Sequence, residues 1–167
     1  MIRWPFSRTA REALTVEPLI SHHLRPAADI HKQTFARAWT DGEIEDLVSS
    51  TSAWAYVARA VDNPNRVAGF IILRMAADEA EVLTIAVKPS WQGYGVGRML
   101  MDAALADAYQ KRLESVFLEV DELNKAARAL YAKLGFKSVA ERPDYYQLDD
   151  GRRTKAVVMR RDLEQRI

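Results

Sequence analysis

The order of hydrophobic and polar positions along the chain predicts a domain that mixes helices and strands. Apolar residues spaced by three or four positions predict helices at residues 26–39, 41–48, 95–112 and 124–134. Alternating or continuously apolar runs predict strands at residues 53–60, 66–75, 81–87, 114–120, 136–139 and 154–159. Strands that first follow one another and then alternate with helices favour an α/β fold with a mixed sheet covered by helices. They disfavour a TIM barrel and an all-parallel doubly wound sheet.

Residues that end helices and form turns support these boundaries. Asp41 is expected to be the N-cap of its helix, and Gly135 is expected to follow the last helix directly. The segments 62–65 and 149–151 consist of Asp, Asn, Pro and Gly, which predicts a turn between strands at each place.

The length of 167 residues corresponds to one domain with a sizeable core. We expect this domain to cover residues 26–167, preceded by a lead-in of unknown role at residues 1–25. Residues 1 to about 18 look loosely ordered, and Trp4 and Phe6 are expected to dock on the domain.

Composition and charge exclude some classes of binding partner and site, and they predict the cellular compartment. The formal net charge is +1, so the protein has no overall field that would recruit nucleic acid or an anionic membrane. The absence of cysteine excludes disulfides, thiolate metal sites and a cysteine nucleophile. No run is apolar enough for a signal peptide or a membrane span, which predicts a soluble, cytoplasmic protein.

Three histidines raise the question of a metal site. His22 and His23 are adjacent in a polar segment, where histidines are usually surface residues, and His31 follows eight residues later. No carboxylate cluster accompanies them at ligand spacing, so we expect no metal site.

The stretch from Ile85 to Arg98 combines a strand, a glycine loop and the start of a helix. Backbone N–H groups in such an arrangement hold phosphate groups. Glycine at 93, 95 and 97 is expected to allow unusual backbone angles and to let a ligand approach the main chain, and Arg98 can contact the same anion. No Gly-Lys-Ser/Thr follows, so this is not a P-loop, and the spacing differs from the dinucleotide fingerprint. A simple chain-reversing turn remains possible from the loop alone.

A second group of residues lies downstream of this loop. Glu119 interrupts an apolar strand, and alone it would be interpreted as a solvent-facing side chain. The loop pattern Gln92-x-x-Gly95-x-Gly97, taken together with Glu119, Asn124, Tyr131 and the sequence Leu-Gly-Phe at 134–136, resembles the GNAT acetyltransferases, which use acetyl-CoA. Within that superfamily, the segments 78–89, 118–124 and 145–152 make the chain most similar to the RimI family of ribosomal-protein-alanine N-acetyltransferases.

This resemblance covers about residues 27–160 and implies a fold, a donor and an acceptor. It implies a GNAT fold: a mixed, mostly antiparallel sheet of six to seven strands, helices on both faces, and a splayed strand pair at the cofactor. It implies acetyl-CoA as donor and a protein N-terminus as acceptor, most of all the N-terminal alanine of a small-subunit ribosomal protein, with no direct contact to nucleic acid or membrane. The residues expected to bind acetyl-CoA are Ile85, Ala86, Val87, Gln92, Gly93, Tyr94, Gly95, Val96, Gly97, Arg98 and Asn124.

The resemblance also assigns catalytic and acceptor-binding residues. Glu119 is the expected general base, acting directly or through a water, and Tyr131 is the expected acid for the coenzyme A thiolate. A backbone N–H of Val87 or Ile85 would polarise the thioester carbonyl. Tyr145 and Tyr146 would border the acceptor, next to an aspartate at 144 where the family often has asparagine.

Two other functions remain open at this point. One is a GNAT enzyme that acetylates a small-molecule amine, and the other is a non-catalytic module that binds acetyl-CoA. An α-amine with a pKa near 8 is about one-tenth neutral at pH 7, whereas a lysine amine near 10.4 is neutral at only about four parts in ten thousand. A carboxylate base therefore favours an N-terminal acceptor over a lysine side chain.

Overall fold

The computed structural model describes residues 12–164 and contains one seven-stranded sheet. The strands are β1 (Leu14–Pro18), β2 (Ala53–Ala60), β3 (Val67–Ala76), β4 (Glu79–Val87), β5 (Ser115–Asp121), β6 (Lys137–Gln147) and β7 (Arg153–Asp162). Their order is β1-β2-β3-β4-β5-β7-β6, and among these strands only β4 and β5 pair in parallel. The predicted mixed, mostly antiparallel sheet is confirmed. The expected docking of Trp4 and Phe6 lies outside the described residues.

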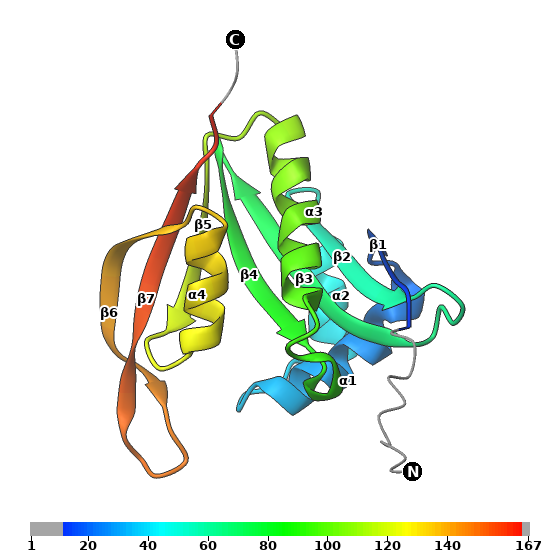
Figure 1. The fold of residues 1–167 in the computed structure, drawn as a ribbon, viewed down its shortest axis with the longest axis horizontal. Coiled ribbons are helices and arrows are strands. Elements are labelled where there is room, and N and C mark those ends of the chain that lie inside the picture. Colours follow the sequence, from blue (N-terminus) through cyan, green and yellow to red (C-terminus); the bar gives the residue numbers. More distant parts are fainter. Residues whose placement is uncertain (1–11, 165–167) are drawn as a thin grey trace, which may run out of the picture.

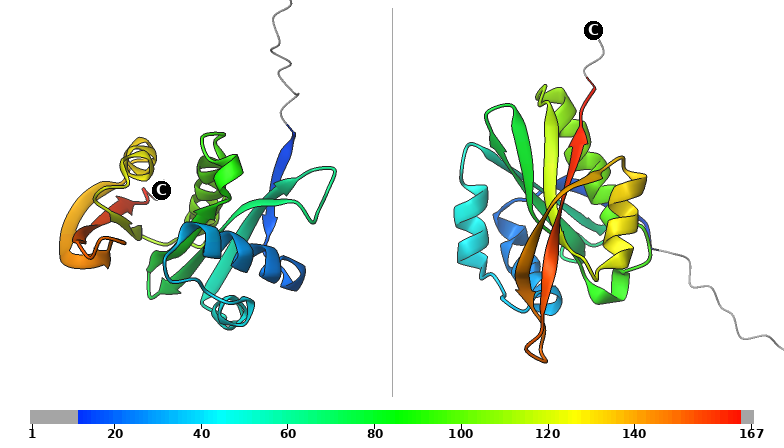
Figure 2. Two further views of the ribbon diagram at one scale, coloured as in Figure 1. Left: turned by 90° about the horizontal axis from the view of Figure 1, so that it is seen from below. Right: turned by 90° about the vertical axis from the view of Figure 1, so that its left-hand side faces the viewer.

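Helices cover both faces of this sheet, as predicted. Helices α1 (Leu24–Thr34) and α2 (Asp41–Val48) lie on one face, and α3 (Val96–Gln110) and α4 (Lys125–Lys133) lie on the other (Figures 1 and 2). Successive residues of a strand point to opposite faces, so the sheet has two cores. Phe70 and Ile72 of β3 pack under α1 and α2, whereas Ile71 between them packs under α3.

The two halves of the sheet are joined by a short parallel contact. Strands β4 and β5 pair only from Glu79 opposite Ser115 to Glu81 opposite Phe117. Beyond this point the two strands diverge, which Figure 1 shows as a V that opens toward the end of the molecule where α3 begins. The expected splayed strand pair is therefore present, and it brings the start of α3 and α4 to the same opening.

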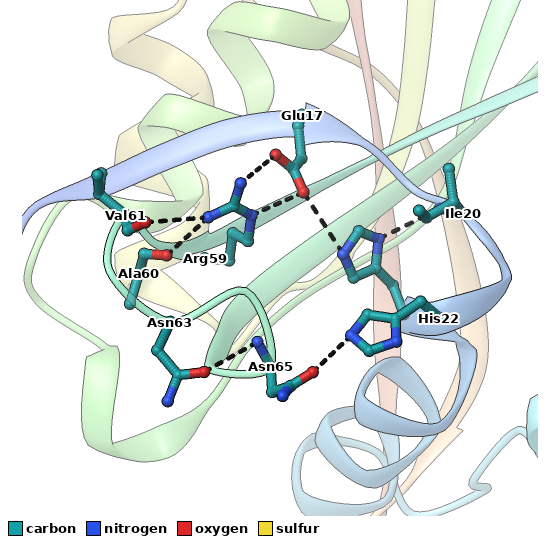
Figure 3. Close-up of polar contacts among 9 residues, drawn as sticks. Glu17, Ile20, His22, Arg59, Ala60, Val61, Asn63 and Asn65 are labelled. Atoms are coloured by element: carbon teal, nitrogen blue, oxygen red, sulfur yellow. Dashed lines mark hydrogen bonds and ion pairs between the residues drawn. The ribbon is translucent and has the colours of Figure 1, made fainter.

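The lead-in is ordered in its last part, and His23 is not a surface residue, so both expectations are wrong there. Strand β1 pairs with the outer edge of β2. The Glu17 carboxylate accepts hydrogen bonds from Arg59 Nε and Nη2, both at 2.7 Å (Figure 3). His23, in the 3-10 turn η1 (Ser21–His23), is buried; its Nδ1 accepts the Ile20 N–H at 3.2 Å and its Nε2 lies 3.5 Å from Glu17 Oε1. These contacts fix β1 and the start of α1 to the sheet.

Helix α1 ends earlier than expected because the chain folds back over His31. Phe35 is extended (φ −124°, ψ 141°). The buried His31 ring stacks on the rings of Phe35 and Trp39, with centroids 4.4 and 4.6 Å away. His31 Nδ1 also accepts the Trp39 N–H at 3.1 Å. The aromatic residues that suggested a longer helix therefore form a tight connection to α2.

The expected capping residue is wrong for α2 and confirmed for α4. The N-cap of α2 is Thr40 rather than Asp41, since Thr40 Oγ1 accepts the Glu43 N–H at 3.2 Å. The Glu43 carboxylate accepts the Thr40 N–H at 2.8 Å, which completes a capping box. Gly135 follows α4 with φ 86°, as predicted for a glycine after a helix.

Strand β6 is longer than the predicted segment 136–139. It runs along the edge of the sheet, paired on one side with β7, and nearly all its residues are exposed. An edge strand with both faces in solvent lacks the alternation that identifies a half-buried strand, so its second half gave no signal in the sequence.

Candidate active site

A cavity of about 480 Å³ lies where the end of β4 meets the start of α3 and one side of α4. Its lining residues are Thr34, Phe35, Ile85, Ala86, Val87, Trp91, Gln92, Gly93, Gly95, Val96, Gly97, Arg98, Asn124, Ala126, Ala127, Leu130 and Tyr131. Every residue expected to bind acetyl-CoA is among them except Tyr94, which is 54 % exposed and whose ring meets Trp91 edge-on at 6.2 Å. Thr34 and Phe35 were missed, because they come from the end of α1 and no local motif marks them.

Beyond Glu81, none of the described strands pairs with β4 on the side that faces β5. Pairing with β5 ends at Glu81. On the β3 side, the Lys88 N–H donates to a carbonyl of β3 at 2.8 Å. Hydrogen-bonded pairs alternate along an antiparallel ladder, so Ala86 also bonds to β3, whereas the N–H groups of Ile85 and Val87 point away from it. In the described part of the chain, these two N–H groups face the gap between β4 and β5.

A β-bulge determines which side chains of β4 face the cavity. Ile72 lies opposite Thr84 and Leu73 lies opposite Val82, so Leu83 is an extra residue on β4. Before the bulge, Val82 packs in the core under α3; after it, Ile85 packs against that core. The bulge therefore shifts the alternation of side chains along β4 by one residue.

The glycine loop presents free N–H groups at the start of α3. Gly93 (φ 81°) and Gly95 (φ 83°) both have left-handed backbone angles that glycine adopts without strain. No atom lies within 4 Å of a Cβ built on either residue, so the requirement for glycine comes from the backbone angle. The first helical hydrogen bond runs from Met99 N–H to Gly95 C=O, at 3.1 Å. The N–H groups of Val96, Gly97 and Arg98 in the first turn and the helix dipole therefore form an anion site.

The third glycine of the loop has a different role from the expected one. Gly97 has no left-handed backbone angle, and a Cβ on it would lie 3.3 Å from Leu130 Cδ2 of α4. The absence of a side chain at Gly97 therefore allows α3 and α4 to approach each other. The expectation of an unusual backbone angle is therefore wrong for Gly97, although Gly97 does line the cavity.

Three polar residues of the cavity hold its walls in place. Gln92 Nε2 donates to Val87 C=O at 3.2 Å, which ties the loop to the end of β4. Arg98 Nε lies 3.1 Å from an Asp102 carboxylate oxygen and is half-exposed. Asn124 Oδ1 caps α4 by accepting a backbone N–H at 3.1 Å, which fixes the side chain, and its Nδ2 group can donate to a ligand or water.

Glu119, the expected base, does not line the large cavity. Its neighbour Leu118 packs in the core under α3, so Glu119 projects from the opposite face of the sheet. There it lines a second cavity of about 280 Å³, together with Arg142 of β6 and the β4 carboxylates of Glu79 and Glu81. Glu119 lies two residues beyond the last β4–β5 pair, at the closed end of the V. Its side chain is 20 % exposed, and its Oε1 lies 3.2 Å from Arg142 Nε.

Two tyrosines have strongly raised pKa values. Burial, and secondly the neighbouring Tyr146, raise the pKa of the Tyr131 phenol to about 12. Burial also raises the pKa of Tyr146 to about 12, followed by the charges of Tyr145, Glu119 and Asp121. Tyr146 interacts with both Tyr131 and Glu119, so the expected acid and the expected base lie around the same point of the sheet.

An irregular part of β6 brings the tyrosine pair to this point. Arg142 pairs with Ala156 and Tyr146 with Thr154, so residues 143–145 bulge out of the ladder. Arg142 and Tyr146 are four residues apart on β6, whereas their partners on β7 are two residues apart. Because both separations are even, Arg142 and Tyr146 lie on the same face of the strand. Tyr145 is half-exposed, and its ring meets that of Tyr146 edge-on at 5.0 Å.

Residues 12–164 show no sign of a metal centre or of a membrane-spanning helix. This part of the chain contains no group of three or more His, Asp or Glu side chains arranged to hold a metal ion. None of its helices is long and apolar enough to cross a membrane.

Comparison with known proteins identifies the family. The profile of the Acetyltransferase (GNAT) family matches residues 24–136. The chain belongs to the GNAT acetyltransferases. The GNAT enzyme "[Ribosomal protein bS18]-alanine N-acetyltransferase" of Haemophilus influenzae is 33% identical over 131 residues, which cover 78% of this chain and 86% of that protein. Its Escherichia coli counterpart is 31% identical over 145 residues, which cover 87% of this chain and 95% of that protein.

Solved GNAT structures show the same fold. The crystal structure of the ribosomal-protein-S18-alanine N-acetyltransferase from Escherichia coli matches with a TM-score of 0.83 and 27% identity, covering 92% of this chain and 96% of that one. This GNAT protein is therefore an N-acetyltransferase of a family that uses acetyl-CoA. The cavity suits that donor, since it combines the free N–H groups of Ile85 and Val87 with the anion site at the start of α3.

Proposed function

We propose that this enzyme acetylates the N-terminal α-amine of a protein, namely the N-terminal alanine of ribosomal protein bS18, with Glu119 as base and Tyr131 as acid. The observation that carries the proposal is the arrangement around the V: β4 backbone groups without a partner strand, a buried phenol in the donor cavity, and a carboxylate on the other face. The two sides of the V thus separate the donor from the acceptor.

On the donor side, backbone groups do most of the binding. The N–H groups at the start of α3 would bind the pyrophosphate of acetyl-CoA. The unpaired backbone of Ile85 and Val87 would bond to the pantetheine amides, as a peptide adds to a sheet edge. One of these two N–H groups would also stabilise the oxyanion that forms when the amine attacks the thioester carbonyl.

On the acceptor side, Glu119 takes a proton from the α-ammonium group, directly or through a water. The neutral amine then attacks the thioester carbonyl carbon, and the carbon–sulfur bond breaks. An α-amine near pKa 8 is about one-tenth neutral at pH 7, so a carboxylate base suffices for it. A lysine amine near 10.4 would demand a much stronger base. The presence of a carboxylate at this position therefore supports an N-terminal acceptor.

The raised pKa of Tyr131 limits how it acts as an acid. A thiol has a pKa near 8.5 and the Tyr131 phenol one of about 12, so complete proton transfer to a free thiolate is uphill by about 5 kcal/mol. Tyr131 therefore donates a hydrogen bond to sulfur while the carbon–sulfur bond breaks. As its proton moves to sulfur, the phenol recovers one from the acetylated nitrogen, which must lose its second proton at this stage.

The identity of the acceptor rests on the relatives. The two bS18-alanine N-acetyltransferases align with 78% and 87% of this chain at 33% and 31% identity. The exposed Tyr145 and half-buried Tyr146 next to Glu119 provide a wall suited to a peptide backbone rather than to a small polycation.

A transfer assay tests this function. Purified protein, acetyl-CoA and a peptide with the bS18 N-terminal sequence should yield an acetylated α-amine by mass spectrometry and one free thiol per turnover. Glu119→Gln should reduce the turnover number about a hundredfold or more, with unchanged affinity for coenzyme A, because the amide cannot accept the proton. An exposed carboxylate far from the V, Asp46 of α2, serves as the control: Asp46→Asn should leave turnover unchanged.

The same assay separates the alternatives. Rapid acetylation of a polyamine or an aminoglycoside without peptide turnover would contradict the proposal and establish a small-molecule acceptor. Binding of coenzyme A without thiol release on any amine would indicate a non-catalytic module. In cells, mass spectrometry of ribosomal proteins with and without this gene identifies the natural acceptor.

A further inference from the structure

Glu119 forms an ion pair with a cation of its own chain. Its Oε1 lies 3.2 Å from Nε of Arg142, and the two side chains are 20 % and 60 % exposed. Both line the 280 Å³ cavity on the acceptor face. The carboxylate that must meet the acceptor ammonium is therefore occupied by a cation from a different strand.

This ion pair is loosely held. The two groups approach closely but do not form a directed hydrogen bond, and no other hydrogen bond to the Glu119 carboxylate occurs in residues 12–164. Arg142 also lies over the face of Tyr145, 5.8 Å from the ring centroid, so it has a second partner when it leaves the carboxylate. The Arg142 side chain is 60 % exposed, so water can replace the carboxylate as a partner of its guanidinium group, which makes the pair easy to exchange.

The neighbouring charges leave Arg142 as the cation of this site. The β4 carboxylates in the same cavity have their own partners: Glu81 lies 3.2 Å from Arg74, and Glu79 lies 3.7 Å from Arg160. On the strand that bears Arg142, Glu141 pairs with Lys155 at 3.2 Å. Within the described residues, Glu119 is therefore the only carboxylate in an ion pair with Arg142.

We propose that Arg142 is a placeholder for the acceptor ammonium: it neutralises Glu119 while the site is empty and gives way when a charged N-terminus arrives. This rests on the proposed role of Glu119. The exchange keeps one cation beside the carboxylate throughout, so the site never holds an uncompensated charge. Arg142 is then a specificity-determining residue, because it sets how strongly a ligand must be charged to gain the carboxylate.

The change in charge of the acceptor during the reaction favours the return of Arg142 to the Glu119 carboxylate. The acceptor enters as an ammonium ion, loses one proton to Glu119 and a second one on forming the amide, and leaves uncharged. Once Glu119 has released its proton to solvent, its carboxylate is negative again and the amide offers no cation to compete with Arg142. The ion pair re-forms beside the product, and the product has no charge interaction that would retain it.

Calorimetry with the coenzyme A complex tests this exchange. The probes are the bS18 N-terminal peptide with a free amine and the same peptide N-acetylated. Arg142→Gln should bind the free-amine peptide about two- to fivefold more tightly than the wild type, because the competing cation is gone. Its affinity for the acetylated peptide should stay within twofold. Arg142→Lys retains a cation and should behave like the wild type.

Two further variants make the result specific. Arg152→Gln removes another exposed arginine, which pairs with Asp150 at 2.7 Å in the β6–β7 turn, and should change neither affinity. In the Glu119→Gln background, adding Arg142→Gln should have no effect on the free-amine peptide, because the carboxylate for which the two cations compete is absent. Arg142→Ala repeats the measurement in case the glutamine variant fails to fold.

Three results would overturn the placeholder role. They are weaker binding of the free-amine peptide to Arg142→Gln, unchanged binding of it, and an equal gain for both peptides. Failure of the proposed function is distinguishable, since it appears as absence of peptide turnover by the wild type. In that case the two peptides are replaced by the amine that the wild type does acetylate and by its acetylated product. The same comparison of affinities between the wild type and Arg142→Gln then tests the role of Arg142.

Discussion

Replacing Gly95 by alanine tests the donor site and separates binding from folding. Gly95 is the N-cap of α3 and has φ 83°, and a Cβ built on it meets no atom within 4 Å. The folded protein therefore loses stability only through the left-handed backbone angle, by about 1–2 kcal/mol. For a chain of this size, each kcal/mol lowers the melting temperature by about 2–4 °C, so the expected decrease is about 2–8 °C.

The chain offers a matched control for this substitution. Gly151, in the turn between β6 and β7, also has φ 83° and also has no atom within 4 Å of an added Cβ. Gly151→Ala should therefore lower the melting temperature by a similar amount. The two variants differ in place, since Gly95 lines the donor cavity and Gly151 does not.

The difference should appear in coenzyme A binding. A shift of the α3 N-terminus by the strained residue would misplace at least one of the N–H groups that we propose to bind the pyrophosphate. A hydrogen bond to a charged group contributes about 1.5–3 kcal/mol, so the dissociation constant should rise about ten- to a hundredfold in Gly95→Ala and stay unchanged in Gly151→Ala. Calorimetry gives the constants and a thermal melt gives the stabilities. Equal melting temperatures with wild-type affinity in both variants would refute the assignment of this loop to the phosphate.

Tyr131→Phe should lower the turnover number about a hundredfold with unchanged coenzyme A affinity, and a wild-type rate in this variant would exclude the phenol as the acid. Because the pKa of Tyr131 is raised to about 12, the phenol stays protonated through pH 10, so any alkaline loss of wild-type activity below pH 10 must come from another group and must recur in Tyr131→Phe. Burial lowers the pKa of His31 below 6.5, so its uncharged form stabilises the fold above about pH 6.5 and this contribution is lost as the pH falls toward the folded-state pKa. Urea unfolding at pH 5 and pH 7.5 should show a smaller pH dependence in His31→Phe, and an unchanged dependence would show that His31 does not titrate on unfolding.

The donor side could be predicted from the sequence because it is contiguous. One stretch from Ile85 to Arg98 contains the end of β4, the loop and the start of α3. The residues that line this part of the cavity are therefore neighbours in the sequence and form a recognisable local motif. The same stretch did not reveal the bulge at Leu83, which depends on the register with β3. The stretch also did not distinguish Gly97 from the two glycines with left-handed backbone angles, because the contact that requires glycine at 97 is with Leu130 of a different helix.

The acceptor side could be predicted only in part. Glu119, Tyr131 and Tyr146 were identified by their resemblance to a family, and no spacing in the sequence links Glu119 to Arg142. That contact arises because β7 lies between β5 and β6: Glu119 pairs with Val158 and Arg142 with Ala156, two positions apart on the same face of β7. Strand β1 was missed for a similar reason: its residues are half-buried, and its place depends on pairing with β2 and on Glu17 meeting Arg59.

The side of β4 that faces the gap between β4 and β5 has a consequence for how this protein tolerates mutation. The N–H groups of Ile85 and Val87 belong to the main chain, so almost any residue at these positions presents the same donors. Proline is the exception, because it has no N–H group. Under the proposed role of these two N–H groups, recognition of acetyl-CoA would persist while the side chains around it change, and the residues that choose the acceptor could diverge without loss of the shared chemistry.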